Sequence, residues 1–110
     1  MKMVYIASPY TVGDVEENVR KQLKAADVMM NYKMCPVIPL YSHFQNELYP
    51  RDYEDWMEID IEKLRRCDAL LRLPGESKGA DKEVKFAKEH GIDVYYNMQD
   101  CINSLKGEKG

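Results

Sequence analysis

The strongest constraint on the fold is a change of hydrophobic period near the start of the chain. A short apolar, β-rich run from Met3 to Ala7 stops at Ser8-Pro9, which is typical of a buried parallel strand that ends in a loop. From Asp14 onward the apolar residues recur at helical spacing, and Asp14 with Glu17 matches the capping-box pattern that begins a helix. A buried strand followed by a long amphipathic helix predicts an α/β fold.

The same alternation continues along the chain. Further strands are expected at 34–40, 69–73 and 92–96, and helices at about 52–66, from near Ser77 to His90-Gly91, and at 101–105. Pro36 and Pro39 indicate that the second strand is short or lies at a sheet edge. The elements predict a Rossmann-like, flavodoxin-like three-layer sandwich with a four- to five-stranded, mainly parallel sheet.

Residues 41–51 lack a clear hydrophobic period and mix aromatic with polar side chains. This composition is more typical of a loop over a pocket than of a packed element, so the segment is expected to be a loop and a lid.

Length and composition limit the classes of protein that fit. A chain of 110 residues is expected to form one domain, over 1–110. The net charge is -3 and the Lys and Arg residues are dispersed, which favours a small-molecule partner over nucleic acid. The three cysteines are widely spaced and are expected to be free thiols, and the first apolar run is too short for a signal peptide or a membrane span. We therefore expect a cytoplasmic protein that does not act at a membrane.

Three loops are expected at the carboxyl ends of the strands, where parallel α/β sheets bind ligands. They are 8–13, 41–50 and 74–80. The third leads into a helix at Ser77, where free backbone amides suit an anion such as phosphate. Glu83 lies about one turn into that helix, where the helix dipole favours an ionised carboxylate able to attack an anomeric carbon. The alternative is that Glu83 is a solvated helix residue beside Lys82 and Lys85.

Three short motifs resemble the nucleoside 2-deoxyribosyltransferase superfamily, which includes the 2-deoxynucleoside 5′-monophosphate N-glycosidases. They are Tyr5-Ile6-Ala7, the segment from Asp60 to Leu71, and the segment from Ser77 to Glu83. The resemblance covers nearly the whole chain as an order of elements. It implies an enzyme that breaks the N-glycosidic bond of a 2-deoxynucleoside or its 5′-monophosphate, by hydrolysis or by transfer of the sugar to another base. It implies no metal and no cofactor for this reaction.

The resemblance also assigns roles to residues of this chain. Glu83 matches the nucleophile that forms a covalent deoxyribosyl ester, and Tyr5 matches the tyrosine that positions this carboxylate. Asp60 matches an acid near the sugar and the leaving base, a role that requires a raised pKa. Asp68, at the junction between a helix and a strand, is read as structural.

Ser77 points to the monophosphate branch. Transferases that act on free nucleosides resemble one another in carrying Asp at this position, whereas the monophosphate glycosidases carry Ser, which can donate to a phosphate. The first loop departs from that branch, because Ser8-Pro9-Tyr10-Thr11 replaces a glycine-rich turn containing Arg. Ser8, Thr11, Lys78 and the amides at the helix start, including that of Gly79, are the alternative phosphate ligands.

Aromatic residues and one histidine are candidates for contacts to the base or the sugar. His43 can hydrogen-bond in either direction, although a loop histidine without a function is equally compatible with the sequence. Tyr10, Tyr41 and Phe44 are candidates for stacking on a base, whereas Trp56 is expected in the core or at a subunit interface.

The resemblance implies a homodimer or higher homo-oligomer, in which a neighbouring subunit completes the site. Asn97 and Met98 are the candidate contributors from the segment after the fourth strand. A nucleotide-binding or sensor domain that keeps the pocket without turnover remains the alternative function, because fold does not fix function. A purely structural protein is the third possibility.

Overall fold

The protein is described by a computed structural model, and the structure describes residues 1–107. Four short strands form one parallel sheet in the order β2-β1-β3-β4. They are β1 (Met3–Ala7), β2 (Cys35–Val37), β3 (Ala69–Arg72) and β4 (Asp93–Tyr95). The predicted α/β, Rossmann-like fold is confirmed, and β2 is both short and at an edge, as its prolines require.

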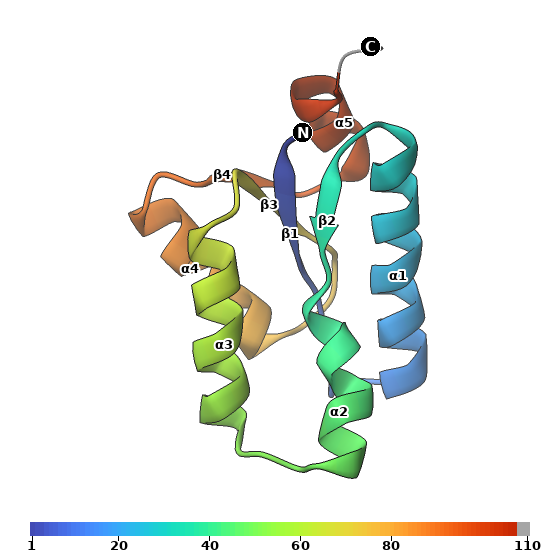
Figure 1. The fold of residues 1–110 in the computed structure, drawn as a ribbon, viewed down its shortest axis with the longest axis vertical. Coiled ribbons are helices and arrows are strands. Elements are labelled where there is room, and N and C mark those ends of the chain that lie inside the picture. Colours follow the sequence, from blue (N-terminus) through green and yellow to red (C-terminus); the bar gives the residue numbers. More distant parts are fainter. Residues whose placement is uncertain (108–110) are drawn as a thin grey trace.

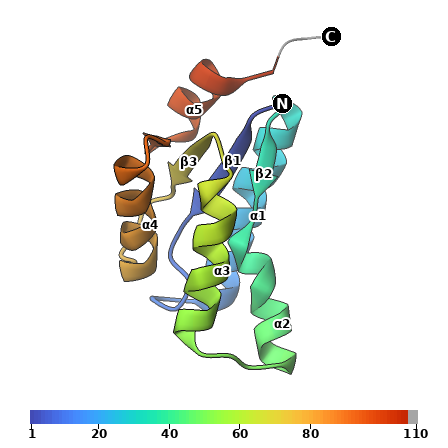
Figure 2. The same cartoon turned by 60° about the vertical axis from the view of Figure 1, so that its left-hand side comes forward.

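Helices cover both faces of this sheet (Figure 1). They are α1 (Val15–Asn31), α2 (Ser42–Leu48), α3 (Tyr53–Arg65), α4 (Lys78–Glu89) and α5 (Met98–Leu105), with a 3-10 turn, η1, at Pro39–Tyr41. Figure 2 shows α3 and α4 together on one side of the strands and α1 behind them. Among the helices within residues 1–107, none has the length and apolar character needed to cross a membrane.

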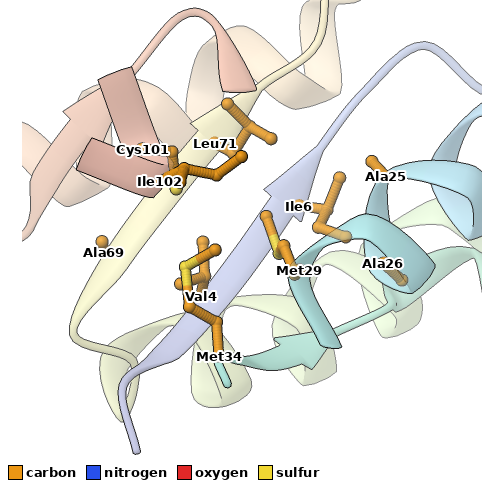
Figure 3. Close-up of a cluster of buried hydrophobic side chains, with 10 residues drawn as sticks. All are labelled: Val4, Ile6, Ala25, Ala26, Met29, Met34, Ala69, Leu71, Cys101 and Ile102. Carbon is orange, nitrogen blue, oxygen red and sulfur yellow. The ribbon is translucent and has the colours of Figure 1, made fainter. Parts of the chain in front are cut away.

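The two helical layers exist because successive strand residues face opposite sides of the sheet. Val4 and Ile6 of β1 pack against α1 and α5, together with Met29 and Ile102, in a core of buried side chains (Figure 3). Tyr5 and Ala7 point to the opposite face, where the second core contains residues of α3 and α4. Tyr5 is therefore directed toward the helices that carry Asp60 and Glu83.

Local signals set the helix ends. Asp14 begins α1, since its Oδ1 accepts the Glu17 N–H at 3.0 Å. Asn97 begins α5 in the same way, with Oδ1 accepting from the Asp100 N–H at 2.8 Å, so this helix starts earlier than predicted. Met98 packs against the first core. Asn97 and Met98 thus have structural roles within the chain.

The expectation that 41–51 is a loop is wrong, because most of it forms η1 and α2. Its hydrophobic period is hidden, since the buried residue of α2 is His43, and the apolar Phe44 and Leu48 are exposed. The helix is held instead by polar contacts, among them the 3.0 Å contact between His43 Nε2 and Glu47 Oε1, one turn apart. Figure 1 shows α2 beyond the carboxyl end of β2.

Candidate active site

A cavity of about 580 Å³ opens at the carboxyl ends of the strands, between the loop after β1, the η1–α2 segment, α3 and the start of α4. Most of the residues predicted for the site line it together. These are Ser8, Tyr10, Thr11, Asp60, Ser77, Gly79 and Glu83. The two remaining predicted residues, Tyr5 and His43, lie behind this lining and contact it by hydrogen bonds.

Glu83 is buried, with 6% of its surface exposed, in the second turn of α4. The hydroxyl of Tyr5, which is fully buried on β1, donates a hydrogen bond to Glu83 Oε2. Burial raises the pKa of Glu83 to about 8; the Asp60 charge adds to this rise, and the Tyr5 hydrogen bond and the Arg72 charge oppose it. The expectation that the helix dipole keeps Glu83 ionised is therefore wrong for the free protein, because desolvation outweighs it.

Asp60 is the second carboxyl of the cavity, on the third turn of α3. Burial raises its pKa to about 6, and the nearby Lys63 charge opposes this shift. The charge of Asp60 also raises the pKa of Glu83, so the two carboxyls of the cavity interact electrostatically. Near neutral pH this carboxyl pair retains a proton, which is a requirement for acid catalysis.

Two hydroxyl groups of the cavity have fixed hydrogen-bond acceptor roles within the protein. Ser77 begins α4, and its Oγ accepts the Ala80 N–H at 3.0 Å. Ser8 Oγ accepts from Gln22 Nε2 at 2.7 Å. A hydroxyl whose oxygen accepts such a bond still has its own hydrogen to donate, so both serines can donate to an oxygen-rich ligand.

Gln22 organises the floor of the cavity and was missed from the sequence. It is buried on α1, where its Nε2 also donates to the Ile6 carbonyl at 3.1 Å and its Oε1 accepts from the Leu40 N–H at 2.9 Å. It therefore ties the end of β1 to η1. The available signal was a polar residue on the apolar face of a helix, between Val19 and Ala26.

Basic and aromatic residues complete the lining: Arg51, Tyr53 and Trp56 come from α3 and the segment before it, and Lys82 comes from α4. Trp56 is not part of the core, because it lines the cavity, and its Nε1 donates to Asn46 Oδ1 at 2.7 Å. The same Asn46 oxygen accepts from the Arg51 N–H at 3.0 Å. One amide side chain thus joins α2 to the start of α3.

Several other expected ligand contacts are not supported by the positions of the side chains. Tyr41 and Phe44 are 60% and 58% exposed and lie outside the cavity lining. His43 is also outside the lining: its Nδ1 lies 2.6 Å from the Tyr10 hydroxyl, so it supports Tyr10 from behind. Asp68 accepts from the Met3 N–H at 2.8 Å and closes the helix-to-strand junction, which fits its structural interpretation.

The loop after β3 is held by Arg72 and by close packing. Arg72 Nη2 donates to the Gly75 carbonyl at 2.9 Å and to Asp81 Oδ1 at 3.0 Å. Gly75 has a φ of +119°, and a Cβ at this position would lie 2.8 Å from Cγ of Pro9. The loops after β1 and β3 therefore meet at a glycine, which fixes the two sides of the cavity relative to each other.

The fold and the cavity together define a class: a Rossmann-like α/β protein with two carboxyls, one of them buried, in a cavity at the carboxyl ends of its parallel strands. The chain belongs to the family described as a domain of unknown function, DUF7768, whose model matches residues 2–97. Among curated proteins, none matches this sequence.

Two solved structures share the fold. The 2-deoxyribosyltransferase of Bacillus psychrosaccharolyticus is 16% identical with a TM-score of 0.66, and the match covers 92% of this chain and 90% of that one. The 2-deoxyribosyltransferase of Leishmania mexicana is 22% identical with a TM-score of 0.64, over 86% of this chain. The chain spans 62% of the length of the Leishmania protein, which is less than two thirds.

Proposed function

We propose that this protein cleaves the N-glycosidic bond of 2-deoxynucleoside 5′-monophosphates through a covalent deoxyribosyl ester of Glu83. The observation that carries the proposal is the pair of carboxyls in one cavity, with Tyr5 donating to Glu83 from behind. Glycoside cleavage requires a carboxylate nucleophile and a carboxylic acid in one site, and Glu83 and Asp60 supply two carboxyls to this cavity. The description of both structural neighbours as 2-deoxyribosyltransferases supports deoxyribosyl chemistry here.

The reaction proceeds from the state in which Asp60 is protonated and Glu83 is ionised. The Glu83 carboxylate attacks C1 of the sugar, the bond from C1 to the base nitrogen breaks, and the base leaves with the electron pair and takes the proton from Asp60. Water or a second base then attacks C1, the ester bond to Glu83 breaks, and Asp60 takes up the proton that is released. Tyr5 is a positioning residue, since its hydrogen bond favours the ionised form of Glu83.

The phosphate is proposed to bind at the start of α4. Ser8 and Ser77 offer hydroxyl donors there, and Lys78 and Lys82 add positive charge to the same lining. Arg51 supplies a further cation to the cavity from the segment before α3. This set takes the place of the glycine-rich, Arg-containing turn that the first loop lacks, and it favours a monophosphate over a free nucleoside.

A second function is favoured by one observation, the raised pKa of Glu83. A carboxyl with a pKa of about 8 is mainly protonated at neutral pH and is then a poor nucleophile. A non-catalytic nucleotide-binding or sensor domain can keep Glu83 protonated, because it does not need an ionised nucleophile. The two functions differ in whether base is released.

The test is base release, measured by chromatography, from a panel of deoxynucleosides and their 5′-monophosphates, with and without acceptor bases. Glu83→Gln is the diagnostic variant, and Glu89→Gln, an exposed position on the same helix, is its matched control. We expect release that is greater from monophosphates, retained in Glu89→Gln and abolished in Glu83→Gln. Intact-protein mass spectrometry of a quenched reaction should detect the mass of the deoxyribosyl phosphate ester. Nucleotide binding without any release would establish the sensor function instead.

A further inference from the structure

A buried histidine links one hydroxyl of the cavity to a carboxylate at the surface. His43 Nδ1 lies 2.6 Å from the hydroxyl of Tyr10, which lines the cavity, and His43 Nε2 lies 3.0 Å from Oε1 of Glu47. The His43 side chain is 11% exposed and that of Glu47 is 61% exposed. The proposed bond cleavage uses none of these three groups.

In the neutral form of His43, its two partners fix the direction of each hydrogen bond. An ionised carboxylate only accepts, so the proton of a neutral imidazole resides on Nε2 and is donated to Glu47. Nδ1 then carries a lone pair and accepts from the Tyr10 O–H. Burial, together with the Glu47 charge, raises the pKa of Tyr10, so this hydroxyl keeps its proton. The oxygen of Tyr10 consequently meets the cavity as an acceptor.

Toward a ligand, Tyr10 is a hydrogen-bond acceptor, whereas the two serines of the cavity are donors. Ser8 and Ser77 receive protein donors at their oxygen atoms and turn O–H donors toward a ligand. Phosphate and sugar ester oxygens need donors, and an acceptor such as Tyr10 would repel them. The Tyr10 oxygen instead complements an N–H group of the ligand.

The hydrogen bond to His43 places this acceptor on the α2 side of the cavity. Ser77 and Glu83 follow β3, whereas η1 and α2 follow β2, on the other side of β1. Tyr10 follows β1 and joins α2 through His43. A substrate with its sugar at Glu83 and its phosphate at the start of α4 leaves the α2 side of the cavity, where Tyr10 lies, for its base.

We propose that Tyr10, oriented by His43 and Glu47, is a specificity-determining acceptor that selects bases carrying an exocyclic amino group over bases with a carbonyl at that position. The inference rests on the proposed function for the identity of the ligand. It adds that the base must present a hydrogen-bond donor. An exocyclic amino group supplies this donor, whereas a carbonyl oxygen is an acceptor and does not.

Binding can be tested separately from turnover in the Glu83→Gln background. Trp56 is the single tryptophan of the chain and lines the cavity, so its fluorescence reports nucleotide binding. We expect deoxyadenosine monophosphate to bind about tenfold more tightly than deoxyinosine monophosphate, and the cytosine nucleotide to exceed the uracil nucleotide similarly. Adding Tyr10→Phe or His43→Phe should reduce each ratio to about one, since the fixed acceptor is lost. Tyr41→Phe, an exposed position outside the cavity, should leave both ratios unchanged.

Other outcomes overturn the inference. The inference fails if the amino and carbonyl bases bind equally, if the carbonyl bases bind more tightly, or if none of the four nucleotides binds. It also fails if the preference survives both Tyr10→Phe and His43→Phe. Circular dichroism of every variant separates loss of the fold from loss of selectivity. Base release by the wild-type protein is scored independently: selective binding without release would refute the proposed function and leave this inference standing, whereas release without base selectivity would do the reverse.

Discussion

Replacing Glu83 by Gln should stabilise the protein at alkaline pH. The carboxyl is buried, and its pKa is raised from an ordinary 4.5 to about 8, chiefly by burial. The folded state therefore holds a proton that the unfolded chain has already released at neutral pH. The resulting stability is fully present below the unfolded pKa and is lost as the pH rises through the folded one. Gln keeps the shape of the side chain and an oxygen that accepts from Tyr5, but it has no charge to bury.

The size of the effect follows from the two pKa values. With 4.5 for the unfolded chain and about 8 for the folded protein, linkage predicts that ionisation of Glu83 costs about 4 kcal/mol of stability between about pH 5 and about pH 9. This is a large share of the roughly 5–15 kcal/mol that stabilises a typical domain. Asp60 is present in both proteins, so the difference between them reports Glu83.

Urea unfolding at a series of pH values, followed by circular dichroism, measures this difference directly. The wild-type protein and Glu89→Gln should lose stability together as the pH rises, and Glu83→Gln should lose about 4 kcal/mol less over the same range. Parallel curves for wild type and Glu83→Gln would refute the reasoning, because they would mean that Glu83 titrates near its ordinary pKa and is hydrated in the folded state.

Three further predictions concern the cavity. First, kcat/KM for base release should follow a bell-shaped pH profile with limbs near 6 and 8, since the carboxyl pair reacts only while it holds one proton. Second, Tyr5→Phe should lower kcat by about tenfold to a hundredfold and move the alkaline limb to higher pH. The Tyr5 hydrogen bond lowers the pKa of Glu83, so its removal raises that pKa. Tyr96→Phe, an exposed control, should change neither quantity. Third, Gly75→Ala should cost about 2 kcal/mol or more in urea unfolding, because its Cβ would meet Pro9, whereas Gly13→Ala, at a positive φ with open space, should cost about 1 kcal/mol.

The predictable part of the fold is the part controlled by hydrophobic period. The β1 run and α1 bury apolar residues at regular spacing, and Pro36 marks β2 as an edge strand, so each could be read from local sequence. The segment 41–51 could not, because α2 buries a histidine and leaves its apolar side chains exposed. The helix depends on polar contacts to other segments, such as those from His43 to Tyr10 and from Asn46 to Trp56, which a hydrophobic period does not reveal.

The site divides in a similar way. Glu83, Asp60 and Tyr5 were found because their motifs resemble those of a known superfamily, and the structure brings them to one cavity or its wall. The ionisation of Glu83 was misjudged, since a helix dipole can be inferred from position, whereas desolvation depends on how the surrounding chain packs. Arg51 was missed for a similar reason: its position depends on the hydrogen bond from its N–H to Asn46 of α2, which no local pattern encodes.

The stability that Glu83 costs explains why its support comes from the most rigid part of the molecule. Tyr5 lies in the middle of β1, which is paired on both sides, and its ring is fully buried between the sheet and the α3–α4 layer. Its hydroxyl cannot move to relieve the buried carboxyl, so the hydrogen bond to Glu83 persists whether or not the cavity is occupied. In the proposed reaction, the positive charge that develops at the sugar would oppose the effect of burial and favour the ionised form of Glu83. The same charge would stabilise a buried carboxylate more strongly than a solvated glutamate at the same distance, because water screens the interaction less in a buried site.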